Sequence, residues 1–239
     1  MKTLVIVPTY NERENVDALM ARFLDAVDGS VHLLVIDDSS PDGTAAVVRI
    51  LATARSGIFV IDRPGKQGLA SAYVTGFRWA LERVYDAVVE MDADLSHDPA
   101  VVPALIAALG DADLVIGSRY VEGGRLVNWS RFRELLSKAG NVYARAWLGF
   151  DVHDSTSGFR AYRCETLAAL DLETVRAEGY SFQIEMAYRI HRKGGRIAEV
   201  PITFTERRHG RSKLSRRIVV EALWRVPLWA VRHRVLGRR

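Results

Sequence analysis

Two aspartates, Asp92 and Asp94, follow an apolar run at residues 87–91 that has the pattern of a buried strand. Side chains of an extended segment alternate, so we expect these two carboxylates to project to the same side. Two ionised carboxylates held close together repel each other unless a cation lies between them. Hard divalent cations such as Mg²⁺ are commonly bound by one or two carboxylates together with the phosphates of a substrate. The spacing therefore predicts a metal–diphosphate site, and the alternative is a solvated turn.

Further polar clusters stand at the ends of other predicted strands. Short apolar runs alternate with helical patterns through the first half of the chain, which is typical of βαβ units and a mostly parallel sheet. Ligands of such sheets bind outside the carboxyl ends of the strands. The clusters are Thr9-Tyr10-Asn11-Glu12, Asp37-Asp38, Asp92-Ala93-Asp94 and Gly117-Ser118-Arg119-Tyr120. We expect all four to form one site in an α/β fold.

The pattern is not that of a dinucleotide-binding domain or a P-loop protein. No Gly-x-Gly-x-x-Gly follows the first predicted strand, and no Gly-x-x-x-x-Gly-Lys-Ser/Thr occurs in the chain. Gly65-Lys66-Gln67-Gly68 precedes a helical pattern and is interpreted as a helix entry turn, with a phosphate-binding loop as the alternative.

The second half of the chain is less regular. We predict helices at residues 129–148 and 181–192, a polar loop at residues 153–160, a strand at residues 197–200 and a basic loop at residues 206–213. Hydrophobic residues make up 49% and charged residues 26% of the chain, which is typical of a globular protein. The single cysteine, Cys164, excludes an internal disulfide and favours a reducing compartment.

The charge is unevenly distributed. Residues 207–239 hold eleven Lys or Arg and one acid, a net charge of +10, so the preceding residues carry −6. A helical projection of residues 216–236 groups Glu221, Arg225 and Arg232 on one stripe and puts Trp224 and Trp229 on the apolar side. Its arginines argue against a membrane span, whereas a basic helix with tryptophans suits a membrane interface. The alternative is a helix packed on the body or on a partner, including a membrane protein.

Several motifs carry a resemblance to a known family. Pro8-Thr9-Tyr10-Asn11-Glu12, Asp37-Asp38-Ser39-Ser40-Pro41-Asp42-Gly43-Thr44 and Asp92-Ala93-Asp94 resemble the motifs of inverting family 2 glycosyltransferases, which have the GT-A fold. Ser157-Gly158-Phe159-Arg160, residues 179–185 and Arg207-x-x-Gly210-x-Ser212-Lys213 are similar to those of polyprenol (dolichol) phosphate mannose synthases. The resemblance covers residues 5–213, and it departs at Ser96, where that family often has Gln.

The resemblance implies a reaction. Mannose would pass from GDP-mannose to a polyprenyl or dolichyl phosphate with inversion, giving the β-linked lipid phosphomannose and GDP. A divalent metal, Mg²⁺ or Mn²⁺, would bind Asp92 and Asp94 and neutralise the leaving diphosphate. The acceptor is a phosphate monoester that is already ionised near neutral pH, so no protein general base is required.

The resemblance also implies roles for individual residues. The catalytic residues would be Asp94, Arg119, Arg207 and Lys213. The nucleotide sugar would contact Pro8, Tyr10, Glu12, one of Asp37 and Asp38, Asp92, Ala93, Asp94, Arg119 and Glu185. The acceptor phosphate would lie against Arg133, Arg207, Ser212 and Lys213. For Glu185 the alternative is a polar position on a helix surface, and His97 is expected to be structural.

These expectations define a domain organisation, a location and a set of alternative functions. Residues 1–213 would be the catalytic GT-A domain, and residues 214–239 a basic, amphipathic membrane-interface tail. The protein would be cytoplasmic and peripherally associated with the cytoplasmic face of a membrane. The alternatives are a UDP-glucose-dependent polyprenyl-phosphate glucosyltransferase, a nucleotidyltransferase and a non-enzymatic membrane scaffold. No nucleic-acid partner is expected, because no recognised binding motif accompanies the basic tail.

Overall fold

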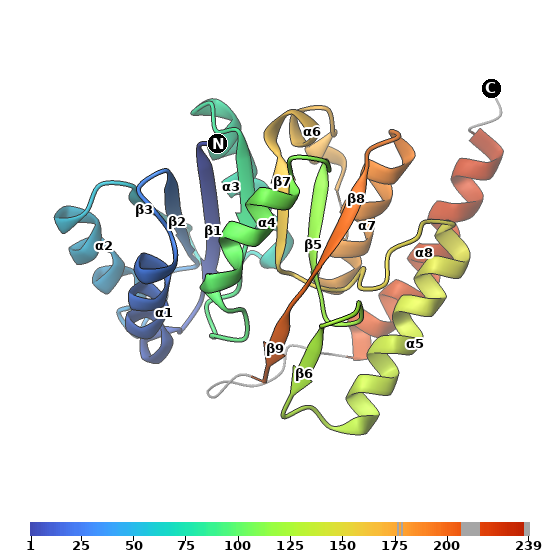
Figure 1. Cartoon of the computed structure of the whole chain (residues 1–239), viewed down its shortest axis with the longest axis horizontal. Helices are drawn as coiled ribbons and strands as arrows, with labels where there is room; N and C mark the ends of the chain where they lie inside the picture. The colour runs from blue at the N-terminus through green and yellow to red at the C-terminus, as the bar shows by residue number, and fades with distance from the viewer. Residues whose placement is uncertain (176, 178, 207–215, 237–239) are drawn as a thin grey trace.

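The computed structural model describes residues 1–175, 177, 179–206 and 216–236. Its centre is a twisted sheet of seven strands with helices on both faces (Figure 1). The strands, in the order in which they pair, are β3 (Ile58–Asp62), β2 (Val31–Asp37), β1 (Thr3–Thr9), β4 (Ala87–Glu90), β7 (Arg160–Arg163), β5 (Leu114–Ser118) and β8 (Ile197–Pro201). Only β7 runs antiparallel to its neighbours among these strands. The prediction of a mostly parallel sheet flanked by helices is confirmed.

Alternation along β1 divides the apolar residues between two cores. Leu4 and Ile6 face a core formed with α3 (Leu69–Glu82) and α7 (Gly179–Arg192). Val5 and Val7 face the opposite core. That second core is closed by α1 (Arg13–Ala26), α2 (Thr44–Ala54) and α4 (Val102–Ala108), the last entered through a 3₁₀ turn at Pro99–Val101. Because both faces of the sheet are covered by helices, the central strands are continuous apolar runs. Polar side chains that could bind a ligand are therefore found at the strand ends.

The strand β7 follows the predicted polar loop, and no strand was predicted from the sequence at this position. It inserts between β4 and β5, with Glu90 opposite Arg160 in the register. Arg160 is fully buried, and its guanidinium donates hydrogen bonds to the carbonyl oxygens of Ser155, Ser157 and Gln183, each at 2.6 Å. A charged residue at the start of a four-residue strand hides the usual apolar signal. The buried charge is tolerated because its donors have partners.

The remaining elements are a second, two-stranded sheet and the helices of the C-terminal half. A small parallel pair joins β6 (Arg125–Val127) to β9 (Thr203–Thr205). The short helix α6 (Cys164–Ala168) and a 3₁₀ turn (Leu172–Thr174) lead to α7. The long helix α5 (Arg131–Leu148) starts at Ser130, whose hydroxyl accepts from the Arg133 amide, and ends at Gly149 in a left-handed conformation.

The C-terminal helix α8 (Arg216–Leu236) lies beside α5 at the edge of the molecule and also contacts α7 (Figure 1). Val226 and Ala230 are buried, and Trp229 packs against the same core, whereas Trp224 is half exposed. The sequence projection put both tryptophans on one apolar face open to lipid, and for Trp229 this is wrong, because that side of the helix packs on the body. None of the helices in the described part of the chain is long and apolar enough to cross a bilayer.

Candidate active site

The polar clusters lie where the strands end. The carboxyl ends of β2, β1 and β4 are adjacent, so the clusters that follow these three strands meet. The fourth cluster follows β5, which is separated from β4 by the antiparallel β7. The loop that precedes β7 therefore also reaches this edge of the sheet and contributes residues to the site.

Asp37 and Asp38 have different tasks at the end of β2. The Asp37 carboxylate accepts hydrogen bonds from Thr9 Oγ1 at 2.8 Å, from the Ser40 amide at 2.8 Å and from Ser40 Oγ at 2.6 Å. Asp38 Oδ1 accepts from Arg63 Nε at 2.6 Å, and both side chains of this ion pair are buried. Asp37 thus ties the end of β1 to the loop after β2, and Asp38 is oriented by an arginine that sequence reasoning missed.

The loop after β1 is tied to the loop after β2. The Glu12 amide donates to Thr44 Oγ1 at 3.1 Å, and the Glu12 carboxylate accepts from Asn15 at 2.8 Å. Tyr10 lies beneath Lys66, whose Nζ is 4.7 Å from the centre of the ring. Gly68, with φ of 94°, then opens α3, so the Gly65–Gly68 segment is a helix entry turn, as its sequence indicated.

The two predicted metal ligands lie in a turn rather than in an extended segment. The strand β4 ends at Glu90, and Leu95 takes a left-handed conformation with φ of 62°. The Asp92 side chain is 34% exposed, whereas Asp94 is buried and accepts hydrogen bonds from the amide and hydroxyl of Ser96. Strand alternation therefore does not set the directions of these two side chains, because the strand ends before them.

His97 supports this turn from behind. Its Nδ1 accepts a hydrogen bond from the Asp92 amide at 3.1 Å, and its ring stacks on Phe159 with a centroid separation of 4.8 Å. Burial lowers the pKa of His97, so the imidazole is neutral near pH 7 and the acceptor nitrogen is available to the backbone. This arrangement gives His97 a structural task in holding the acidic turn.

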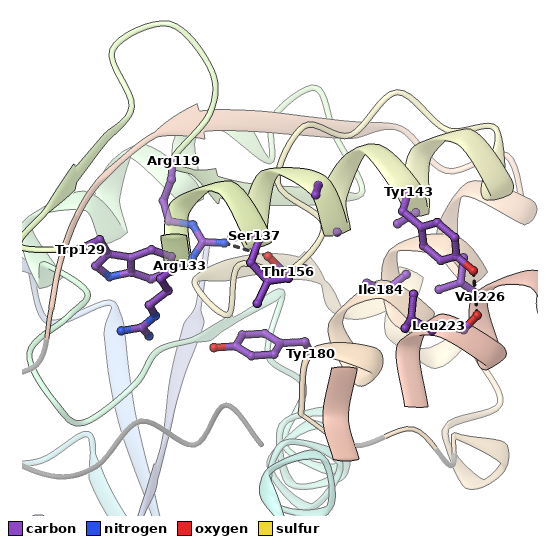
Figure 2. Close-up of a pocket in the computed structure, with 14 residues that line it drawn as sticks. Arg119, Trp129, Arg133, Ser137, Tyr143, Thr156, Tyr180, Ile184, Leu223 and Val226 are labelled. Carbon is purple, nitrogen blue, oxygen red and sulfur yellow. Dashed lines mark hydrogen bonds between the residues drawn. The ribbon is translucent and has the colours of Figure 1, made fainter. Parts of the chain in front are cut away.

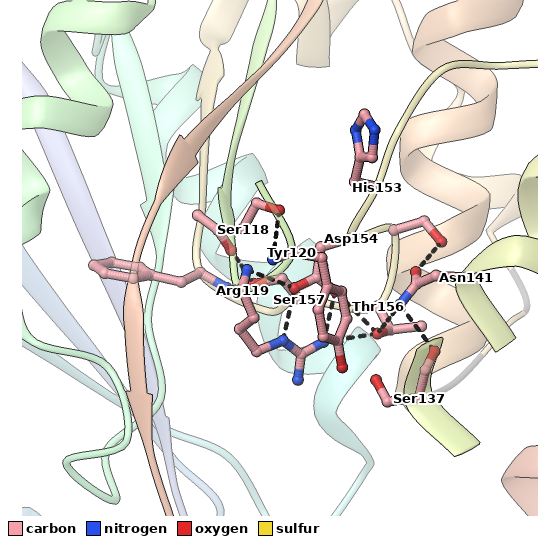
Figure 3. A network of polar contacts seen from close by, with 12 residues as sticks. Ser118, Arg119, Tyr120, Ser137, Asn141, His153, Asp154, Thr156 and Ser157 are labelled. Atoms are coloured by element: carbon pink, nitrogen blue, oxygen red, sulfur yellow. Dashed lines mark hydrogen bonds and ion pairs between the residues drawn. The ribbon is translucent and has the colours of Figure 1, made fainter. Parts of the chain in front are cut away.

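Arg119, at the end of β5, forms the centre of a buried polar network (Figure 3). Its Nε and Nη2 donate to the two oxygens of Asp154, each at 2.6 Å, and its backbone amide donates to Asp154 Oδ2 at 3.0 Å. Nη2 also donates to Thr156 Oγ1 at 2.9 Å. Among the residues that the structure describes, none accepts a hydrogen bond from Nη1. The guanidinium is thus fixed along the edge formed by Nε and Nη2.

Asp154 is the partner that sequence reasoning missed. Burial alone would raise the pKa of Asp154, but the charge of Arg119 and the hydrogen bonds from it lower that pKa below its ordinary value. The Asp154 amide in turn donates to Glu199 Oε1 at 2.9 Å. A signal was present in the sequence, because Asp154 lies in the predicted polar loop, just before the Ser157-Gly158-Phe159-Arg160 motif.

A pocket of about 380 Å³ adjoins this network (Figure 2). One end carries Arg119 and Arg133 beside Trp129, with the Arg133 guanidinium 4.0 Å from the centre of the indole. Arg133 also pairs with Glu206 at 2.6 Å. The rest of the pocket runs between α5, α7 and α8. Its apolar lining includes Leu136, Tyr143, Ala144, Ile184, Leu223 and Val226. The pocket therefore joins a cationic end to an apolar body.

Glu185 lies on α7 and is buried rather than on a helix surface. Its carboxylate pairs with Arg189 one turn later and accepts the Ala177 amide at 3.2 Å. On the same helix, Gln183 donates to Glu90 Oε2 at 2.7 Å. Burial raises the pKa of Glu90 to about 7, which Arg160 and Gln183 only partly offset. These contacts tie the start of α7 to the strands below the acidic turn.

Three of the predicted residues, Arg207, Ser212 and Lys213, lie outside the described residues. Within the described part of the chain, no group of three or more His, Cys, Asp or Glu side chains is arranged to hold a metal ion. Asp92 and Asp94 could therefore supply only part of a coordination shell. This fits a hard cation that takes its other ligands from a diphosphate and water.

Comparison with known proteins places the chain in a family. The family model for glycosyl transferase family 2 matches residues 4–170. The chain is 49% identical over 239 residues to undecaprenyl-phosphate mannosyltransferase of Micrococcus luteus, an alignment that covers 100% of this chain and 98% of the relative. It is 48% identical to polyprenol monophosphomannose synthase of Mycolicibacterium smegmatis, over 98% of this chain and 89% of the relative.

A solved structure has the same fold. Glucosyl-3-phosphoglycerate synthase of Mycobacterium tuberculosis, in complex with Mn²⁺, UDP-glucose and phosphoglyceric acid, aligns with a TM-score of 0.68 and 26% identity. The alignment covers 94% of this chain and 79% of that one. The fold is the GT-A arrangement that the sequence motifs resembled. This chain belongs to glycosyl transferase family 2.

Proposed function

We propose that the protein transfers mannose from GDP-mannose to a polyprenyl phosphate, giving the β-linked lipid phosphomannose and GDP. The observation that carries the proposal is the pocket between α5 and α8, where Arg119 and Arg133 stand at one end of an apolar lining. A phosphate on a hydrocarbon chain has the same division of charge and apolar surface. The names of the relatives from Micrococcus luteus and Mycolicibacterium smegmatis support this acceptor and this sugar.

The donor side of the site is assigned to the ends of β1, β2 and β4. Pro8, Tyr10, Glu12 and Asp38 would hold the nucleoside, and Asp38 is already oriented by Arg63. Asp92 and Asp94 would hold a divalent metal, Mg²⁺ or Mn²⁺, with the donor diphosphate completing its shell. When bound, the metal supplies charge neutralisation for the departing diphosphate.

The chain's own residues position the acceptor phosphate. Its ionised oxygen forms the new bond to the anomeric carbon of mannose while the bond to the GDP oxygen breaks, with inversion at that carbon. Because the nucleophile is already an anion, no side chain has to remove a proton from it. Arg119 and Arg133 would orient it by charge-assisted hydrogen bonds. We assign Arg207, Ser212 and Lys213 to the same phosphate on the resemblance of their motif.

We further propose that residues 1–213 are the catalytic domain and residues 214–239 a tail that meets the cytoplasmic face of a membrane peripherally. The support is the net charge of +10 on residues 207–239 and the exposure of Leu223 and Trp224 on α8. A membrane protein is the alternative occupant of that helix. The two assignments can be tested separately, because removing the tail should weaken membrane binding more than it affects the transfer reaction.

A direct assay tests the proposed reaction. The protein is incubated with polyprenyl phosphate, Mg²⁺ or Mn²⁺, and either radiolabelled GDP-mannose or radiolabelled UDP-glucose, and the lipid is then extracted. We expect label in the lipid phase from GDP-mannose only. Label from UDP-glucose alone would identify a glucosyltransferase, and release of pyrophosphate from a nucleoside triphosphate would identify a nucleotidyltransferase.

A further inference from the structure

The two-stranded sheet β6–β9 touches both halves of the proposed site. On one side, the Thr205 amide of β9 donates a hydrogen bond of 3.4 Å to the carbonyl oxygen of Ser96, in the acidic turn formed by residues 92–97. On the other side, Gly124 precedes β6 and packs so closely on the backbone of Arg119 that an added Cβ would lie 2.7 Å from its carbonyl carbon. The small sheet is therefore in contact with the donor half and with the acceptor half.

Phe204, on β9, contacts both halves through its ring. The centre of this ring lies 5.5 Å from that of His97, in an edge-to-face arrangement at 73°. His97 is the residue whose Nδ1 accepts the hydrogen bond from the Asp92 amide. The guanidinium of Arg119 lies 5.5 Å from the centre of the same phenylalanine ring. One aromatic side chain thus separates the imidazole that supports the acidic turn from a guanidinium assigned to the acceptor phosphate.

Trp129, which follows β6, continues this contact to the second arginine. Its indole meets the Phe204 ring edge to face, with 5.5 Å between the ring centres and an angle of 83°. The centre of the Trp129 ring lies 5.3 Å from the guanidinium of Arg119 and 4.0 Å from that of Arg133 (Figure 2). The face of an aromatic ring attracts a cation, so the indole holds two like charges in place that would otherwise repel each other.

We infer that Phe204 and Trp129 are positioning residues that fix the separation of the acidic turn from the two arginines of the pocket. This role rests on the proposed function, because direct transfer needs the attacking oxygen and the anomeric carbon about 3–3.5 Å apart. A misplacement of about 1 Å can lower the rate of such a reaction about 10²-fold. Neither ring has to touch a substrate, since each acts through the imidazole or the guanidinium on which it packs.

Replacing Phe204 tests the inference through a difference between kcat and KM. Phe204→Leu removes the ring and keeps an apolar side chain, whereas Phe204→Tyr keeps the ring. The matched control is Phe59→Leu, because Phe59 is also partly buried and also makes an edge-to-face pair with a histidine, His32, at 5.9 Å. This control lies near the amino end of β3, away from the strand ends that form the site.

We expect Phe204→Leu to lower kcat for transfer about tenfold or more, with both KM values within about twofold of native. Hydrolysis of GDP-mannose without acceptor should stay unchanged, because water does not need the two arginines. Phe204→Tyr should restore kcat, and Phe59→Leu should keep it while losing a similar amount of stability to urea. A raised KM with native kcat in Phe204→Leu, or an equal loss of kcat in Phe59→Leu, would overturn the inference.

A distance measurement separates this inference from the proposed function. Mn²⁺ with GDP is the probe at the acidic turn, inorganic phosphate is the probe at the arginines, and phosphorus NMR relaxation reports their separation without turnover. We expect the relaxation rate of bound phosphate to change about twofold in Phe204→Leu, as a displacement of about 1 Å implies, and to stay native in Phe59→Leu. If the native protein transfers no mannose, the proposed function fails, and this comparison still decides the positioning role. A native relaxation rate in Phe204→Leu, or no effect of Mn²⁺ on phosphate in the native protein, would refute it.

Discussion

Arg119 is held by Asp154 in a buried ion pair, with two nitrogens of the guanidinium bonded to the two oxygens of the carboxylate. Removing one partner of such an ion pair leaves the charge of the other buried and uncompensated. The geometry also decides which edge of the guanidinium faces the pocket. Asp154 is therefore a positioning residue for Arg119, although it need not touch either substrate.

We expect Asp154→Asn to lower kcat/KM for the lipid acceptor about 10²-fold and to destabilise the fold by about 3 kcal/mol, because the amide cannot balance the buried charge. Steady-state kinetics and urea unfolding measure the two effects. The control is Glu173→Gln, which removes an exposed ion pair with Arg78 and should change either quantity little. Full activity in Asp154→Asn would show that Arg119 needs no such support.

Glu90 predicts a pH dependence of stability. Its pKa is about 7 in the folded protein and near 4.3 when unfolded, so between these values the folded state binds the extra proton. The contribution of Glu90 therefore favours folding below pH 4.3 and is lost as the pH rises through 7.

We expect Glu90→Gln to be more stable than the native protein at pH 8 by about 2 kcal/mol, with the difference shrinking toward pH 5. Urea unfolding at both pH values measures it, with Asp111→Asn on an exposed turn as the control. A difference that does not vary with pH would refute the assignment of this titration to Glu90.

At the scale of elements, the sequence predicted the parallel strands and their helices well. Apolar runs such as residues 4–7 and 33–36 correspond to β1 and β2, because strands buried on both faces are continuously hydrophobic. The strand β7 was not predictable in this way, since its ends are charged and its pairing with β4 and β5 joins segments far apart in the chain.

The candidate site was predictable to a similar extent. Polar residues after strands identified Asp38, Asp92, Asp94 and Arg119, because strand ends converge in any parallel sheet. Their partners were missed: the polar loop gave only a general signal for Asp154 and nothing singled out Arg63, because the fold creates both ion pairs between distant segments.

The turn between α3 and β4 carries a strained residue. Val84 is 80% exposed and has φ of 54°, a conformation that is unfavourable for a β-branched side chain. We expect Val84→Asn to stabilise the protein by about 1 kcal/mol, because Asn tolerates the left-handed region. Val84→Ala keeps the Cβ and should recover little of this. Urea unfolding compares the three proteins, and equal stability of Val84→Asn and the native protein would contradict the strain.

At the scale of the whole molecule, the proposed function requires the sheet edge and the pocket between α5 and α8 to bring two chemically different substrates together. The donor side offers Asp92 and Asp94 but, in the described residues, no third protein ligand for a metal. The metal should then bind weakly to the protein alone and at least about tenfold more tightly with GDP present. Electron paramagnetic resonance of Mn²⁺ measures this without turnover. Asp92→Asn and Asp94→Asn should remove the enhancement by GDP, whereas tight binding without nucleotide would contradict the shared shell.

The acceptor side is tested by filling the pocket. Gly140 lies on α5, lines the pocket, and a Cβ added there would meet no atom within 4 Å. Gly140→Leu should therefore fold normally, and even gain up to about 1 kcal/mol of helix stability, while its side chain occupies the apolar space. Gly140→Ala is the graded control, since it adds one methyl group and leaves most of the pocket open.

Whether the lipid acceptor binds in the pocket between α5 and α8 is tested most directly by the KM of Gly140→Leu for polyprenyl phosphate. The affinity of the same variant for GDP is measured by calorimetry. If the lipid acceptor binds between α5 and α8, KM for polyprenyl phosphate rises about tenfold or more, Gly140→Ala stays close to the native value, and GDP affinity is unchanged. If KM for polyprenyl phosphate in Gly140→Leu equals that of the native protein, the acceptor binds elsewhere and the account of this pocket is wrong.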